Sequence, residues 1–159
     1  MMRRRLQIVV LAVLFALLPS PAGPVAKEQQ TPKPPAQTIA IVSGAGFPKD
    51  RLTLKELRAI YLGEFVILKD LWIHPIDQQE TQPIRRKFLE QVVRMTRDRY
   101  IDYWNQRLFR YGGFTPLLKN NGRDVIETVR EEDGTLGYVW LEEARSEPKI
   151  KVLLTLDNP

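Results

Sequence analysis

The chain has 159 residues, with 24 Lys and Arg against 19 Asp and Glu, one His and no Cys. The lack of cysteine excludes disulfides, thiolate nucleophiles and thiolate metal sites anywhere in the chain. The formal charge of +5 would suit an acidic partner, so the position of the basic residues decides which partners remain.

The first 22 residues show the three parts of a cleavable export signal. Three arginines precede an apolar run over residues 6–18, and a short segment with small residues and prolines follows the run. The run is shorter than the roughly 20 residues of a membrane-spanning helix, and the prolines prevent its extension. We therefore predict cleavage after Ala22, with Ala26 as the second choice and an uncleaved signal anchor as the alternative.

Export would place the protein in the periplasm or outside the cell, without a stable membrane anchor. Cleavage would also remove the three arginines, which leaves 21 basic against 19 acidic residues and a charge of +2. So small a charge gives little support to nucleic-acid binding, which relies on many basic side chains. We expect no nucleic-acid partner.

Residues 23–37 (GPVAKEQQTPKPPAQ) are rich in Pro, Gln and Lys and contain little that a core could bury. This composition is typical of an extended, solvated linker. Residues 38–159 have the length of one domain and show no internal repeat. The predicted order is a signal peptide over 1–22, a disordered linker over 23–37 and one folded domain over 38–159.

The domain begins with a predicted buried strand, Thr38–Val42, which ends in the small residues Ser43–Gly46. Thr53 and Glu56 form a capping-box pair at the start of a helix, and Gly63 provides its C-terminal stop. We expect Gly63 to adopt a left-handed backbone conformation there.

Further elements follow in regular alternation. A short strand is predicted over 72–76, a helix from Pro83, another helix from Thr96 to the Gly112–Gly113 pair, and a fourth helix from about Gly122. Strands are then predicted over 137–140 and 150–154. Strands that alternate with helices in this way predict an α/β fold with a mostly parallel sheet flanked by helices.

Four segments appear in an order that resembles a known family: Leu52–Gly63 (LTLKELRAIYLG), Ile73–Asp77, Tyr103–Trp104 and Gly134–Val139 (GTLGYV). They resemble the phosphate-binding proteins of ABC transporters, in the short single-lobe form of the periplasmic-binding-protein-like (type 2) superfamily. The resemblance covers nearly all of residues 38–156. It implies a single lobe of that fold.

The resemblance also implies a function. The favoured interpretation is a non-enzymatic extracytoplasmic substrate-binding module for phosphate or another small oxyanion. The alternative is an accessory protein-interaction domain, bound to another envelope protein, that has lost small-ligand binding.

The residues that hold phosphate in the family are largely replaced. The family uses an arginine and a Gly-Ser-Gly-Thr turn at the start of a helix, where backbone N–H groups favour an anion. The matching residues here are 77–83 (DQQETQP), with Asp77 at the position of the arginine and Glu80 in place of a glycine. We expect these two carboxylates to satisfy the helix N-terminus themselves and to repel phosphate, which would then bind weakly or not at all.

Three residues remain as candidate ligand contacts. Thr81 is the hydroxyl left in the matching turn, and Ser43 and Gly44 lie in the loop after the first strand, which faces the ligand cleft in the two-lobe relatives. The loop has neither a Lys-Ser/Thr pair nor a GxGxxG spacing, so an ordinary turn is the alternative there.

Catalysis, cofactors and metal ions are not expected. His74 is the only histidine, and a metal site would require it to converge with Asp77 or Glu80. Carboxylate pairs can be drawn among Glu64, Asp77 and Glu80, but no nucleophile, oxyanion hole or cofactor motif accompanies them.

The middle of the chain is basic, with aromatic residues interleaved. The simpler interpretation is a set of solvated helix faces over an aromatic core. The other is a docking surface for an acidic partner or for anionic lipid headgroups. Exposure of Tyr103 and Phe109 beside Arg107 and Arg110 would favour the docking surface.

Overall fold

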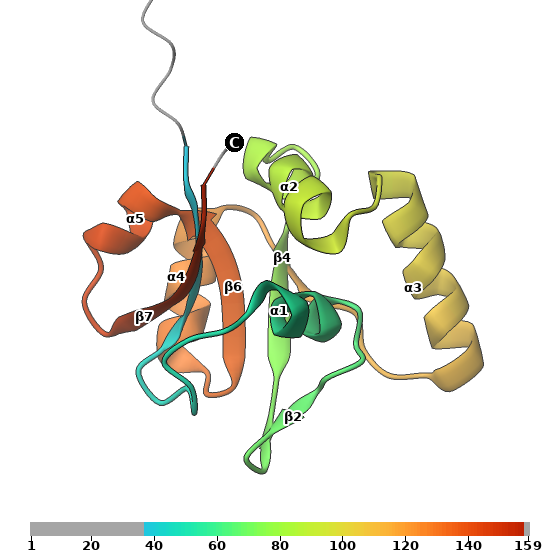
Figure 1. Ribbon diagram of the computed structural model, residues 1–159, viewed down its shortest axis with the longest axis horizontal. Helices are drawn as coiled ribbons and strands as arrows, with labels where there is room; N and C mark the ends of the chain where they lie inside the picture. The colour runs from blue at the N-terminus through green and yellow to red at the C-terminus, as the bar shows by residue number, and fades with distance from the viewer. Residues whose placement is uncertain (1–36, 158–159) are drawn as a thin grey trace, which may run out of the picture. The chain divides into compact units, whose positions relative to one another are not determined.

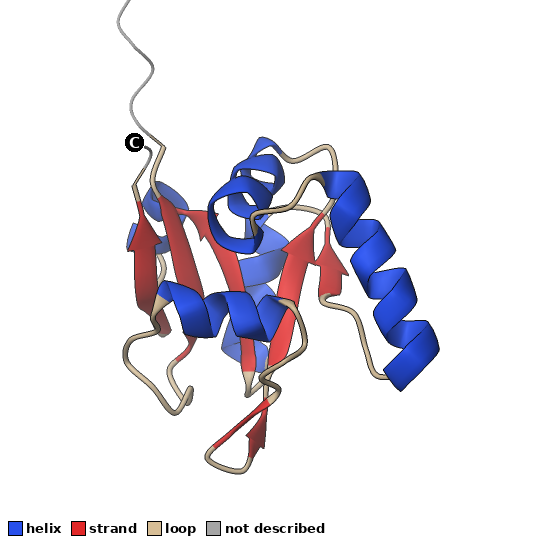
Figure 2. Cartoon of the chain, turned by 45° about the vertical axis from the view of Figure 1, so that its right-hand side comes forward, coloured by secondary structure: helices blue, strands red, loops and turns tan. Residues whose placement is uncertain are grey.

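The computed structural model describes residues 37–157, so the predicted signal peptide and nearly all of the predicted linker lie outside this range. In the described residues a five-stranded sheet has the order β5-β4-β6-β1-β7, with helices on both faces (Figures 1 and 2). The strands are β1 (Ile39–Gly44), β4 (His74–Gln78), β5 (Leu117–Lys119), β6 (Thr135–Trp140) and β7 (Ile150–Leu156), and a separate hairpin is formed by β2 (Ile67–Leu68) and β3 (Leu71–Trp72).

Four of the five strands in the sheet point the same way. β4 pairs in parallel with both β5 and β6, whereas β1 is antiparallel to both β6 and β7. β1 therefore runs against the other four. The predicted α/β lobe with a mostly parallel sheet between helices is confirmed.

The helices form one layer on each face of the sheet. One layer contains α1 (Leu54–Tyr61), α2 (Pro83–Phe88), the π-helical turn η1 (Leu89–Val93) and α3 (Arg97–Tyr111), and the other contains α4 (Gly122–Glu131) and α5 (Leu141–Arg145). α3 docks on the C-terminal end of α1, because the Tyr100 hydroxyl donates to the Tyr61 carbonyl and the Tyr103 hydroxyl to the Leu62 carbonyl. Among the described residues, no helix has the length and apolar character that crossing a membrane requires.

Alternation along β1 builds the two halves of the core. Ile39 and Ile41 pack towards α1, α2 and η1, while Ala40 and Val42 pack towards α4. Gly137 in β6 faces α4 so closely that an added Cβ would lie 2.4 Å from Cγ1 of Val125. A side chain at that position would force the helix away from the sheet.

The local predictions for α1 are confirmed. Thr53 accepts a hydrogen bond from the Glu56 N–H, and the Glu56 carboxylate accepts one from the Thr53 N–H, which is the reciprocal capping box. Gly63 has φ of +67° just after the helix. The helix predicted from Pro83 differs from expectation in its second half, where η1 ends at Val93 and the N–H of the C-cap residue Arg94 donates to the Leu89 carbonyl, five residues back.

Candidate functional site

Charged side chains gather beyond the carboxyl end of β4, the place where open α/β sheets usually bind ligands. A hollow of about 650 Å³ lies there, between α2, η1 and the start of α3. Its lining contains four arginines and two glutamates: Arg85, Arg86, Arg94, Arg97, Glu80 and Glu90. We refer to it as the arginine hollow.

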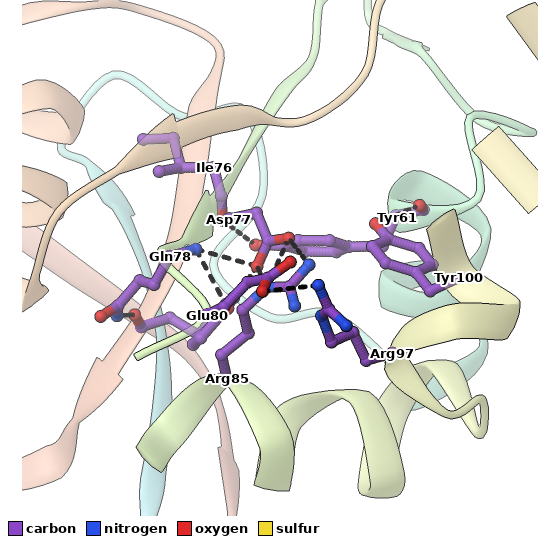
Figure 3. Close-up of polar contacts among 9 residues, drawn as sticks. Tyr61, Ile76, Asp77, Gln78, Glu80, Arg85, Arg97 and Tyr100 are labelled. Atoms are coloured by element: carbon purple, nitrogen blue, oxygen red, sulfur yellow. Dashed lines mark hydrogen bonds and ion pairs between the residues drawn. The ribbon is translucent and has the colours of Figure 1, made fainter. Parts of the chain in front are cut away.

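The Asp77 carboxylate at the end of β4 is buried and fully engaged (Figure 3). Arg85 from α2 donates to Oδ2 through Nε at 3.1 Å and through Nη2 at 2.9 Å. The Tyr138 hydroxyl donates to Oδ1 at 2.5 Å, and the Gln78 N–H donates to the same oxygen at 2.8 Å. A cation, a hydroxyl and a backbone N–H, the donors that an oxyanion site would use, thus all bind the protein's own carboxylate.

Glu80 is also paired, but at the surface. Its carboxylate lies 2.8 Å from Nη2 of Arg97, and both side chains are about half exposed. The expectation that Asp77 and Glu80 occupy the N-terminus of α2 was wrong, because Gln82 is the N-cap residue there and no side chain caps the helix. The two carboxylates bind Arg85 and Arg97 instead.

The pairing fixes the protonation states of the cluster. Burial opposes the charge of Arg85, but the hydrogen bonds and charge of Asp77 outweigh it and raise the pKa of Arg85. Burial and the nearby Asp77 charge raise the pKa of Tyr138 well above its usual value. The hydrogen bond from Arg97 lowers the pKa of Glu80. The Tyr138 hydroxyl therefore remains a hydrogen-bond donor, Arg85 remains a cation and Glu80 remains ionised.

Two arginines of the hollow are left over. Among residues 37–157, no ion pair involves Arg86 or Arg94, and both side chains are exposed. Their guanidinium groups can bind an oxyanion in bidentate geometry. The hollow is open to solvent and Glu90 lies in it, so this charge is offset in part.

The three predicted ligand contacts do not come together. Thr81 lies exposed in the turn after β4, whereas Ser43 is buried and pairs with Leu136 at the start of β6. Leu136 also pairs with Pro75 at the start of β4, so Ser43 lies near the start of that strand, whereas Thr81 follows its carboxyl end. The reversed direction of β1 causes this separation.

Gly44 also has a structural reason to be a glycine. An added Cβ would lie 2.3 Å from the carbonyl oxygen of Val129 in α4. Ser43 donates its hydroxyl to the Gly44 carbonyl at 3.4 Å. A ligand contact at Ser43, Gly44 or Thr81 stays a prediction.

A second hollow, of about 350 Å³, lies at the other end of β4. It is lined by residues from α1, β3, the start of β4, α3 and the segment after α3, among them Trp72, Trp104, Arg107, Tyr111 and Phe114. We call it the aromatic groove. Sequence reasoning did not single out Trp72, Tyr111 or Phe114, although the last two flank the Gly112–Gly113 pair at a helix end, where no core-forming pattern accounts for them.

The conditional prediction for the basic region is met for one residue. Phe109 is exposed, but Tyr103 is half-buried and its hydroxyl donates to the Leu62 carbonyl at 2.6 Å.

His74 is exposed at the start of β4 and lines the aromatic groove. Three strand positions separate it from Asp77, so the two side chains point to opposite faces. Residues 37–157 contain no group of three side chains able to hold a metal ion.

Comparison with known proteins identifies the fold. No family model matches the chain, and no curated protein matches it. Several solved structures match, and three of them each cover 74% of the chain. A protein assigned as a phosphate ABC transporter substrate-binding protein, with bound phosphate, from Clostridium perfringens has 16% identity and a TM-score of 0.59. An ABC-type phosphate transport receptor from Vibrio cholerae has 17% and 0.57, and PstS from Borrelia burgdorferi has 14% and 0.58.

These likenesses show that the lobe has the fold of phosphate ABC transporter substrate-binding proteins. The match covers 44%, 46% and 47% of the three solved chains, so this chain spans less than half of their length. At this level of identity the likeness extends to the fold alone.

Proposed function

We propose that this chain is a non-enzymatic binding module that works outside the cytoplasm and binds phosphate or another small oxyanion weakly. The observation that carries the proposal is the arginine hollow, which lies at the carboxyl end of β4 in a lobe with the fold of phosphate-binding proteins. Arg86 and Arg94 are the side chains that remain available for an anion there.

Weak binding follows from the geometry of the hollow. Asp77 already accepts from Nε and Nη2 of Arg85, and Arg97 pairs with Glu80 through Nη2 and with Asp98 through Nη1. A small anion would therefore meet two exposed guanidinium groups in an open hollow, with Glu90 beside it. Tight binding of so small a ligand requires that most of its surface is covered, and this lobe alone does not cover it.

A catalytic role has little support in the same cluster. The buried Asp77 carboxylate is the strongest candidate for a general base, but Arg85, Tyr138 and Gln78 all donate to it. A general base must lie within hydrogen-bond reach of the substrate proton, and the Asp77 side chain is buried and already bound by three donors of the protein. This favours a binding role over an enzymatic one.

The test is a titration of the exported protein with phosphate and with sulfate, monitored through the backbone amide signals in NMR spectra. We expect saturable shifts at residues 80–97 with a Kd in the millimolar range. Arg94→Gln should weaken this binding, whereas Arg123→Gln, on the exposed face of α4, should not. If phosphate at tens of millimolar shifts no amide of residues 80–97, the oxyanion assignment is wrong.

Export has its own test. Intact-mass measurement of protein from the cell envelope should give a chain that begins near Gly23, with cleavage after Ala22. Protein that still contains residues 1–22 would contradict the cleaved signal and would favour the signal anchor.

The second candidate is an accessory domain that binds an envelope protein and has lost its small ligand. It is favoured by the internal carboxylate of Asp77, which fills the donor cluster that an oxyanion would need. In that case phosphate would cause no shifts at residues 80–97, and the binding surface would lie elsewhere on the lobe.

A further inference from the structure

The aromatic groove contains large apolar side chains that the lobe leaves uncovered. Phe114 is 89% exposed, Tyr111 is 75% exposed and Trp72 is 58% exposed. Single exposed apolar residues are common on protein surfaces, but aromatic side chains that surround one concave site are typical of interfaces. The groove is therefore a candidate docking surface.

The back of the groove is held in place by the end of α1. Gly63 has φ of +67°, and an added Cβ there would lie 2.9 Å from both Nε of Arg107 and Cη2 of Trp104. Arg107 donates through Nη2 to the Gly63 carbonyl, and its guanidinium lies 5.8 Å from the centre of the Tyr111 ring. The side chains at the back of the groove are thus fixed before any partner arrives, which lowers the entropic cost of binding.

The fixed charges in the lining of the groove and of its neighbouring hollow are all positive. A smaller hollow of about 120 Å³ adjoins it and shares Arg107 and Tyr111, and Arg110 lines this second hollow as well. Within residues 37–157, neither hollow has an Asp or Glu in its lining. In the lining of these hollows, a bound segment would meet arginines and aromatic rings and no carboxylate.

We propose that the aromatic groove docks an acidic segment of another protein, with an aromatic or branched aliphatic side chain of that segment inserted between Trp72, Trp104 and Phe114. A single peptide side chain can enter a concave groove, whereas a membrane surface contacts a flat or convex face of a protein. The shape of the groove therefore favours a peptide. Arg107 and Arg110 would pair with the acidic residues on either side of the anchor.

This proposal does not depend on oxyanion binding. The groove is lined by His74 and Pro75 at the start of β4, whereas the arginine hollow follows the end of that strand. Phosphate binding at residues 80–97 and peptide binding at the groove can therefore succeed or fail separately.

The experiment uses the exported protein with 15N-labelled tryptophan and three pools of short synthetic peptides. The pools share random apolar positions filled by Leu, Phe and Trp, and their other positions are all acidic, all basic or all Ser and Gln. The three indole N–H signals provide the readout, because Trp72 and Trp104 line the groove and Trp140, at the end of β6, is outside it. We expect the acidic pool alone to shift Trp72 and Trp104 saturably and to leave Trp140 unchanged.

Matched variants separate the groove from general charge. Phe114→Ser and Arg110→Glu, both at exposed positions, should each weaken binding of the acidic pool by about tenfold in Kd. Arg123→Glu changes the charge equally on the opposite layer and should leave the affinity unchanged. Equal binding of all three pools, shifts at Trp140, or no shift with any pool would overturn the proposal, as would binding to anionic vesicles without binding to the acidic peptides.

Discussion

The two ends of β4 differ in how the lobe treats the side chains around them. At its carboxyl end, Asp77 is buried and each of its oxygens has a donor from the same lobe. At its start, Trp72, Tyr111 and Phe114 remain exposed around the aromatic groove. A buried charge without a partner strongly destabilises the folded state, so the lobe must pair Asp77 internally. Exposed apolar side chains destabilise it little, so they can remain uncovered until a partner binds. The uncovered end is thus the better place to look for a macromolecular partner.

The largest expected effect concerns the buried pair. Asp77→Ala leaves Arg85 charged and without its carboxylate in a site where the side chain is 9% exposed. Loss of one partner of a buried pair typically costs about 3–5 kcal/mol of unfolding free energy. Urea denaturation measures this loss directly.

The matched control for that variant is Glu80→Gln, which removes the exposed pair with Arg97 and should have a much smaller effect. Similar losses for the two variants would mean that Asp77 is not the charge on which the cluster depends. A double variant, Asp77→Leu with Arg85→Met, should recover part of the stability, because it leaves no unpaired charge but still leaves the buried Tyr138 hydroxyl without its acceptor.

The sequence predicted the parts of the lobe that depend on near neighbours. The capping box of Thr53 and Glu56 and the left-handed Gly63 require only local signals, and both are present. The Asp77–Arg85 pair was missed because it depends on how α2 is rotated towards β4, and Tyr138 comes from a strand 61 residues away. The position of Ser43 was missed for a similar reason, since no local pattern specifies that β1 runs against its neighbours.

The next effect tests the frame of the aromatic groove with two glycines. Gly63 and Gly112 have φ of +67° and +66°, but only at Gly63 would a Cβ meet neighbours within 4 Å. Gly112→Ala should therefore cost about 1–3 kcal/mol from backbone strain alone, because its ψ of −157° lies in a region that only glycine readily populates. Gly63→Ala should cost a similar amount, but here Trp104 and Arg107 must also move. The indole N–H signal of Trp104 separates the two causes: it should shift in Gly63→Ala and not in Gly112→Ala, and an unchanged signal in Gly63→Ala would show that Gly63 does not position the groove.

Glu56 is a partly exposed carboxylate with which the buried Asp77 can be compared, and its expected effect on stability is smaller. The hydrogen bond from Lys49, and then those from Thr53, lower the pKa of Glu56 from its usual 4.5 to about 2. The folded state therefore binds this proton less readily than the unfolded state. The stabilisation is fully present above about pH 4.5 and is lost as the pH falls towards about 2.

Glu56→Gln should consequently destabilise the protein at pH 7 by a few tenths of a kcal/mol to about 1 kcal/mol, since solvent screens this partly exposed pair. The difference from wild type should shrink as the pH falls below 4.5, which urea denaturation at several pH values can follow. A difference that grows in acid would contradict the assigned role of Glu56.

The smallest expected change in unfolding free energy is at Phe114, which separates a role in binding from a role in folding. The side chain is 89% exposed, so Phe114→Ser removes almost no buried apolar area and should change the unfolding free energy by less than about 0.5 kcal/mol. The same substitution should weaken binding of the acidic peptides. A residue that matters for binding and not for folding is one that the lobe presents to a partner. A large loss of stability in Phe114→Ser would instead mean that the ring packs against the lobe in solution and that the aromatic groove is closed.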